Sequence, residues 1–151
     1  MNLQEELKAL KKRIAELEEL AKEEREFPKM GDIYWRIDDR GSVDNCMYNN
    51  YYTDNHRQAI GNFFKTKKQT EFAVEKLKVE AELRKFSRPF ECGEINRYIF
   101  LDTNSGCLNL AGLSYSQYQG TIYFESEDKA YDAIESVGED RIIKYLFGME
   151  D

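Results

Sequence analysis

The sequence has few of the residues on which catalytic and metal sites are usually built. It contains one histidine, His56, and three cysteines, Cys46, Cys92 and Cys107, with no Cys-x-x-Cys spacing. This pattern indicates neither a disulfide framework nor a zinc site, and it predicts reduced thiols that are mostly buried. No serine or cysteine has a catalytic setting, and there is neither a Walker-type loop nor a dinucleotide-binding glycine pattern. We therefore expect a protein that is not an enzyme and needs no cofactor or metal.

Long apolar runs and excess positive charge are also absent. No stretch approaches the ~20 apolar residues of a membrane span, and residues 1–6 lack the basic start of a signal peptide. We expect a cytoplasmic protein. Lys and Arg number 22 against 29 Asp and Glu, for a formal net charge of -7, which argues against binding a nucleic-acid polymer through the overall field. Any site for an anion must therefore be local.

The N-terminal segment, residues 2–26, has the heptad pattern of a helix that packs against another helix. Its apolar residues alternate at spacings of four and three, and mixed charges flank them at Glu6, Lys11, Arg13 and Glu18; the apolar set is Leu3, Leu7, Leu10, Ile14, Leu17 and Ala21. An isolated helix this polar is marginal in water, so the stripe must dock, either on a second copy or back on the chain itself. We predict an oligomerisation helix over residues 1–27 and a ligand-binding domain over residues 28–151.

The rest of the chain predicts an α+β domain. Short β-branched and aromatic runs separated by turn residues predict strands at 33–37, 42–48, 97–101, 107–111 and 121–124. Capping signals at Thr66 and Ser126 predict helices from 67 to about 87 and from 127 to a glycine cap at Gly138, followed by a short helix over 140–147. We expect an antiparallel sheet of about five strands with the long middle helix and the C-terminal helices packed on it, and no internal repeat.

The candidate binding groups are aromatic and cationic. Trp35, the only tryptophan, either stacks on a planar ligand or anchors the core. Arg57 can grip a phosphate while Gly61 lets a backbone amide approach it, although both also suit a solvated turn. Arg141 and Lys144 lie one helical turn apart and either hold a diphosphate or form an ordinary exposed face.

Four runs of sequence resemble a family of small proteins from phages and prophages of Gram-positive bacteria. They are Gly-Thr-Ile-Tyr-Phe-Glu-Ser at 120–126, Gly-Glu-Asp-Arg-Ile-Ile-Lys-Tyr-Leu-Phe-Gly at 138–148, Arg-x-x-x-Gly-Asn-x-Phe-Lys-Thr at 57–66, and Ala-Val-Glu-Lys-Leu-Lys at 73–78. Within that family the chain resembles the Thoeris anti-defence sponge proteins, type one, which bind the cyclic ADP-ribose signals of a bacterial immune system without degrading them. The resemblance covers about residues 32–149 and leaves out the heptad helix.

The resemblance implies a homo-oligomer, a dimer or an assembly of dimers, with ligand pockets between subunits. An adenine would lie on Trp35, with Phe100 as a second ring. Asn109 would bond a base or ribose, and Arg141 with Lys144 would hold two phosphates. The resemblance further implies a second site for cyclic trinucleotides, for which Arg57 and Gly61 are the candidates.

The sequence departs from the family's pattern in two places. It reads Thr-Lys-Lys-Gln at 66–69 in place of an acidic helix start, and it offers only Ser, Tyr and Gln where a basic residue is expected within 114–119. These departures concern the choice of ligand more than the fold.

The expected function is therefore that of a phage anti-defence protein. It would capture a cyclic nucleotide signal in the host cytoplasm and so block signalling of the Thoeris or CBASS type. The alternative is an inhibitor that binds a host or phage protein directly through its acidic surface and heptad helix. An aromatic pocket with converging Arg and Lys favours the first function, and a flat acidic face favours the second.

Overall fold

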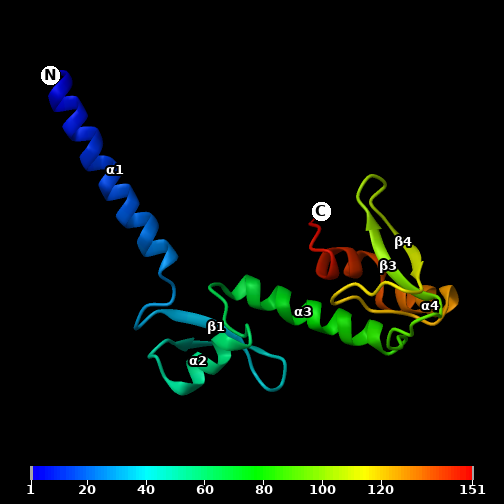
Figure 1. Ribbon diagram of the computed structural model, residues 1–151. Coiled ribbons are helices and arrows are strands. Elements are labelled where there is room, and N and C mark those ends of the chain that lie inside the picture. The colour runs from blue at the N-terminus through cyan, green and yellow to red at the C-terminus, as the bar shows by residue number, and fades with distance from the viewer. Residues whose placement is uncertain (1, 151) are drawn as a thin grey trace. The chain divides into compact units, whose positions relative to one another are not determined.

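The computed structural model describes residues 2–150, apart from the side chains of residues 23–25. By its internal contacts the chain forms two compact units, one running to Thr70 and the other beginning at Glu71. Figure 1 labels the elements along the chain. The predicted division by role, into residues 1–27 and 28–151, stays a prediction.

The first unit holds a long helix, a hairpin and a short helix. Helix α1 (Leu3–Arg25) begins at Asn2, whose side-chain oxygen accepts a hydrogen bond from the Glu5 amide at 2.9 Å. Strands β1 (Ile33–Ile37) and β2 (Val43–Met47) pair antiparallel. Helix α2 (Tyr52–Ala59) forms where the sequence predicts a loop.

The second unit packs helices against a hairpin. Helix α3 (Lys67–Arg84) begins in the first unit and continues through the second, where strands β3 (Asn96–Asp102) and β4 (Cys107–Leu113) pair antiparallel. Helix α4 (Glu127–Val137) follows, then the short α5 (Glu139–Arg141) and a π-helix, η1 (Ile142–Leu146).

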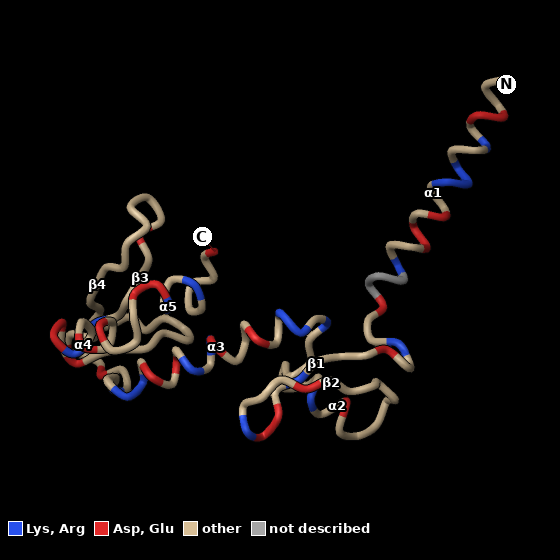
Figure 2. The backbone as a smooth tube through the Cα atoms, turned by 180° about the vertical axis from the view of Figure 1, so that it is seen from behind, with Lys and Arg blue, Asp and Glu red and all other residues tan. Residues whose placement is uncertain are grey.

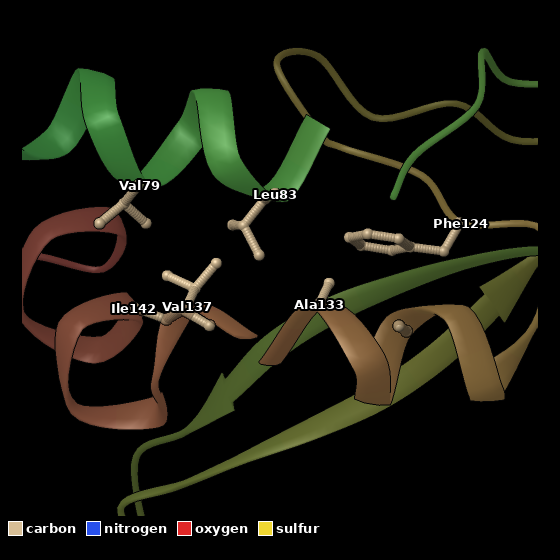
Figure 3. Close-up of a cluster of buried hydrophobic side chains, with 7 residues drawn as sticks. Val79, Leu83, Phe124, Ala133, Val137 and Ile142 are labelled. Carbon is tan, nitrogen blue, oxygen red and sulfur yellow. The ribbon is translucent and has the colours of Figure 1, made fainter. Parts of the chain in front are cut away.

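The core of the second unit lies between α3, α4 and the start of η1, and Figure 3 shows side chains from all three pointing toward one another. Partly buried residues of the hairpin pack against it. The fully packed members are Val79, Leu83, Phe124, Ala130, Ala133, Val137 and Ile142. The predicted packing of the middle and C-terminal helices on strands is confirmed for this unit.

The α+β class is confirmed, but the single sheet of about five strands is wrong. The described residues form two separate two-stranded antiparallel sheets, β1–β2 and β3–β4. The segment predicted as a fifth strand makes isolated bridges only, Tyr123 with Arg88 and Phe124 with Arg97.

The two units nevertheless share one local arrangement of backbone hydrogen bonds. In the first unit the amides and carbonyls of Trp35 and Phe64 exchange two hydrogen bonds of 2.8 Å each. In the second unit Arg97 and Phe124 do the same at 3.0 and 2.8 Å. Each hairpin is thus completed by one residue that pairs reciprocally with its first strand.

The similarity between the two units extends to residues before and after the bridged residues. Two residues after each bridging phenylalanine, a hydroxyl caps the next helix: Thr66 and Ser126 each accept a hydrogen bond of 3.2 Å from the amide three residues on. Four residues before the paired residue of each hairpin stand Gly31 and Gly93, both with φ of +90°, and each opens a Gly-acid-Ile run. The expectation of no internal repeat is therefore wrong. The similarity was missed because it rests on turn and cap residues rather than on a continuous motif.

Candidate ligand-binding site

A buried polar network in the first unit takes up Arg57. The hydroxyl of Tyr34, a fully buried side chain, donates to Asp54 Oδ1 at 2.5 Å and accepts from Arg57 Nη1 at 2.8 Å. The other oxygen of Asp54 accepts from the amides of Asn49 and Tyr51 at 3.1 and 3.2 Å. The network fastens α2 to β1, so the guanidinium predicted to grip a phosphate is engaged within its own unit.

The same network sets the charges of its members. Burial, and then the hydrogen bond to Asp54, raise the pKa of Tyr34 to about 12. The Tyr34 hydroxyl and the two backbone amides lower the pKa of the Asp54 carboxyl from its ordinary value. At neutral pH the cluster therefore holds a neutral phenol between a carboxylate and a guanidinium.

Trp35 and Gly61 also lie in the first unit. Trp35 is half-buried, and the Lys67 ammonium lies over its ring, 5.9 Å from the centroid. Gly61 is exposed with φ of +78°, and a Cβ there would meet no atom within 4 Å. Its backbone is therefore open to solvent.

Phe100 and Asn109 of the second unit lie directly opposite each other across β3 and β4, and both are exposed. Because strand side chains alternate, they lie on the opposite face from Ile99 and Leu108, which pack on the core. The face that carries Phe100 and Asn109 is thus the one turned away from the core helices.

Arg141 and Lys144 belong to the helices on the core side of that hairpin. Arg141 donates to Glu82 Oε2 at 2.8 Å and to the Val137 carbonyl at 3.2 Å. This hydrogen bond to Glu82 raises the pKa of Arg141 and lowers that of Glu82. Lys144 is exposed, with its ammonium 5.3 Å from the Tyr145 ring centroid. Within one chain, therefore, Glu82 pairs with one of the two predicted phosphate-binding cations, Arg141. Arg141 and Lys144 also belong to helices on the other side of the hairpin from Phe100 and Asn109.

The second unit does contain a basic hollow, which the sequence reasoning missed. It lies where α3 ends and has a volume of about 410 Å³. Clefts of roughly 300 to 1,000 Å³ commonly hold small molecules. Two arginines and no acidic residue line it; the lining residues are Arg84, Ser87, Arg88, Pro89, Phe90, Gln117, Gly120, Thr121, Ile122 and Tyr123.

Three hydrogen bonds fix the position of the Arg88 guanidinium. It donates to the Asn96 side-chain oxygen at 2.6 Å and to the carbonyls of Pro89 and Ile95 at 3.1 Å each. Asn96 is itself fully buried. All three acceptors are neutral, and within the described part of the chain no carboxylate forms an ion pair with Arg88. The site therefore contains a fixed positive charge without a counterion.

Arg84, the last residue of α3, is the more exposed of the two arginines. Its side chain is 59% exposed and lies 3.7 Å from Glu80, a type of surface pair that contributes little. Phe90 and Tyr123 provide an apolar wall, with ring centroids 5.2 Å apart and planes at 64°. The hollow thus combines a hydrogen-bonded cation, an exposed cation and an aromatic surface.

A second hollow in the same unit has the opposite charge. It measures about 380 Å³ and is lined by Ile95, Arg97, Glu125, Ser126, Glu127 and Asp128. Its one arginine already lies 3.4 Å from Glu127. Three carboxyl groups against one paired guanidinium would repel an anion, so an anionic ligand should prefer the Arg84–Arg88 hollow.

Other site types receive no support from the described residues. Cys46 is partly buried, but Cys92 and Cys107 are exposed, so the expectation of mostly buried thiols is wrong. Cys92 lies in a turn before β3, and Cys107 is the first residue of β4. Within residues 2–150, no three His, Cys, Asp or Glu side chains gather as a metal would require. None of the helices described there combines the length and hydrophobicity needed to cross a membrane.

Comparison of the chain with protein-family models, with curated proteins and with solved structures finds no match. The resemblance to the phage sponge proteins therefore stays a prediction.

Proposed function

We propose that this protein binds and sequesters an anionic cyclic nucleotide of the cyclic ADP-ribose type in the host cytoplasm, and so silences an immune signal. The observation that supports this best is the Arg84–Arg88 hollow, whose lining contains two arginines, two aromatic residues and no acidic residue. In this proposal the two arginines hold the phosphates and the Phe90 ring lies against the base.

The free energy available from these contacts is sufficient for micromolar binding. A charge-assisted hydrogen bond contributes about 1.5 to 3 kcal/mol, and a base stacked on an aromatic ring about 1 to 3 kcal/mol. Two arginines and one ring give roughly 4 to 9 kcal/mol, and a micromolar dissociation constant corresponds to about 8 kcal/mol. A cyclic ligand is already rigid, so it loses little entropy on binding. Tighter capture needs contacts beyond the hollow, which the resemblance places between subunits.

Retention without cleavage suits the chemistry of the lining. It contains no histidine, carboxylate or thiol to act as a general base or nucleophile. Its serine, Ser87, donates its hydroxyl to the Arg84 carbonyl at 2.8 Å and belongs to the helix end. The ligand should therefore leave the protein unchanged.

The test is calorimetric titration of the protein with cyclic ADP-ribose isomers and cyclic trinucleotides. Arg84→Glu should weaken binding by about tenfold or more, since one charge-assisted contact is lost and an acid is added. Arg40→Glu is the matched control, because Arg40 is also exposed and lies 3.8 Å from an acid, but in the other unit. Equal affinities of the two variants would show that the ligand does not bind in the Arg84–Arg88 hollow.

The ligand is then released by heating and identified. Intact ligand supports sequestration, whereas a cleaved product would make the protein an enzyme. No heat with any of these ligands would favour the alternative function, direct binding of a host or phage protein. The apolar stripe of α1 and the net charge of -7 are the features that such a partner would use.

A further inference from the structure

The apolar stripe of α1 is exposed within its own unit, as far as the structure describes that unit (residues 2–70). Its leucines and isoleucine are between 49% and 83% exposed, and they are Leu3, Leu7, Leu10, Ile14 and Leu17. A contiguous exposed stripe of this kind marks an interaction surface, because large apolar side chains gain free energy when they leave water. Both signs of charge accompany the stripe along α1 (Figure 2).

We propose that α1 pairs with α1 of a second copy of this chain as a parallel, in-register, two-stranded coiled coil. The proposal goes beyond the ligand function and does not depend on it. The apolar stripe alone would fit several partners, and the charges beside it make the choice.

The heptad assignment follows from the spacing. Leu7, Ile14 and Ala21 occupy the a positions, and the d positions hold Leu3, Leu10 and Leu17. Leucine stands at every d position, and the one β-branched residue of the seam, Ile14, stands at an a position; this is the placement found in two-stranded coiled coils.

The flanking charges favour the parallel orientation. Glu6 and Arg13 take the g positions, while Lys11 and Glu18 take the e positions. In a parallel pair each g residue faces the e residue of the next heptad on the other helix. Glu6 therefore faces the partner's Lys11, and Arg13 faces the partner's Glu18, each twice by symmetry and always with opposite sign.

An antiparallel pair would have unfavourable contacts. In that orientation g faces g and e faces e, so at full overlap Arg13 would face the partner's Arg13, and Lys11 the partner's Lys11. The ion pair that Arg13 already makes with Glu16 of its own helix, at 3.3 Å, is exposed and weak, so it does not prevent pairing across the seam.

The test uses two charge-swap variants of the full chain. The first carries Glu6→Lys with Arg13→Glu, and the second carries Lys11→Glu with Glu18→Lys. Each should dimerise about tenfold or more weakly than the unchanged chain, because all its cross-helix pairs become like-charged. An equimolar mixture of the two variants should restore dimers, since every pair is again of opposite sign.

The matched control is Lys12→Glu with Glu19→Lys, which makes the same exchange of charges at f positions, away from the seam. It should leave the dimer unchanged. Sedimentation equilibrium over a concentration series gives the dimer dissociation constants, and circular dichroism shows whether each variant keeps its helix.

Three results would overturn the proposal. One is an unchanged chain that stays monomeric at every concentration. Another is an assembly of three or more chains, which contradicts a two-stranded coil. The last is a dimer indifferent to the e and g exchanges, as an antiparallel pair or a different interface would give.

Discussion

Replacing Tyr34 by Phe tests whether the network of Tyr34, Asp54 and Arg57 holds the first unit together. The substitution removes one hydroxyl and keeps the buried ring, which stacks on Phe63 with centroids 4.1 Å apart. Packing is thus conserved, and the loss of stability reports the two hydrogen bonds of the hydroxyl.

The expected loss is about 2 to 3 kcal/mol. Both partners of the hydroxyl are charged, and such hydrogen bonds contribute about 1.5 to 3 kcal/mol each, without being additive. Asp54 is 3% exposed, so water cannot readily replace the lost donor. Its remaining contacts with two backbone amides and with Arg57, 4.0 Å away, keep the loss below that of an unpaired buried charge.

The assay is urea unfolding followed by tryptophan fluorescence. Trp35 is the only tryptophan and lies in β1, beside Tyr34, so the signal reports the first unit. Tyr52→Phe, at an exposed tyrosine of α2, is the matched control and should cost nothing measurable. A Tyr34→Phe variant as stable as this control would refute the reasoning.

The pH dependence provides a second readout of the same network. The folded pKa of Tyr34 is raised from 10.0 to about 12, so the neutral phenol stabilises the fold fully below pH 10. That contribution should be lost as the pH rises from 10 toward 12. The Tyr34→Phe variant cannot show this loss, so the difference in stability between the two proteins should shrink across that window.

Three further predictions concern the second unit. Phe124→Ala should destabilise it by about 3 to 5 kcal/mol in thermal unfolding, because it empties the core beside α4, whereas a loss below 1 kcal/mol would contradict that packing. Ser126→Ala should cost about 1 kcal/mol by removal of the α4 cap, and Ser126→Asp should restore it. Arg141→Ala should leave ligand affinity within about threefold in calorimetry, since Glu82 already holds the guanidinium; a tenfold loss would assign Arg141 to the ligand.

Local features of the fold were predictable because neighbouring residues determine them. The hairpin at 33–47, the cap at Ser126 and the helix stop at Gly138 all form as expected. Helix α2 was missed because its sequence has no apolar periodicity and because Asp54, which anchors it, takes its hydrogen bonds from residues outside the helix. The single sheet was wrong because spacing along the chain does not say which strands pair.

The sequence predicted the types of residue in the candidate site but not which residues form it. Cationic and aromatic groups were expected, yet availability depends on whether an acid lies nearby in the folded chain. Asp54 and Glu82 engage two of the predicted arginines, Arg57 and Arg141. Arg88 has neutral acceptors only, a difference that comes from tertiary contacts.

The central claim, that the Arg84–Arg88 hollow holds an anionic nucleotide, is tested most directly by amide NMR during titration with cyclic ADP-ribose. The account predicts that signals of residues lining the hollow, such as Ser87 and Thr121, shift progressively while those of the 38–41 turn stay in place. Shifts confined to Phe100, Asn109 and Lys144, with none around the hollow, would contradict it.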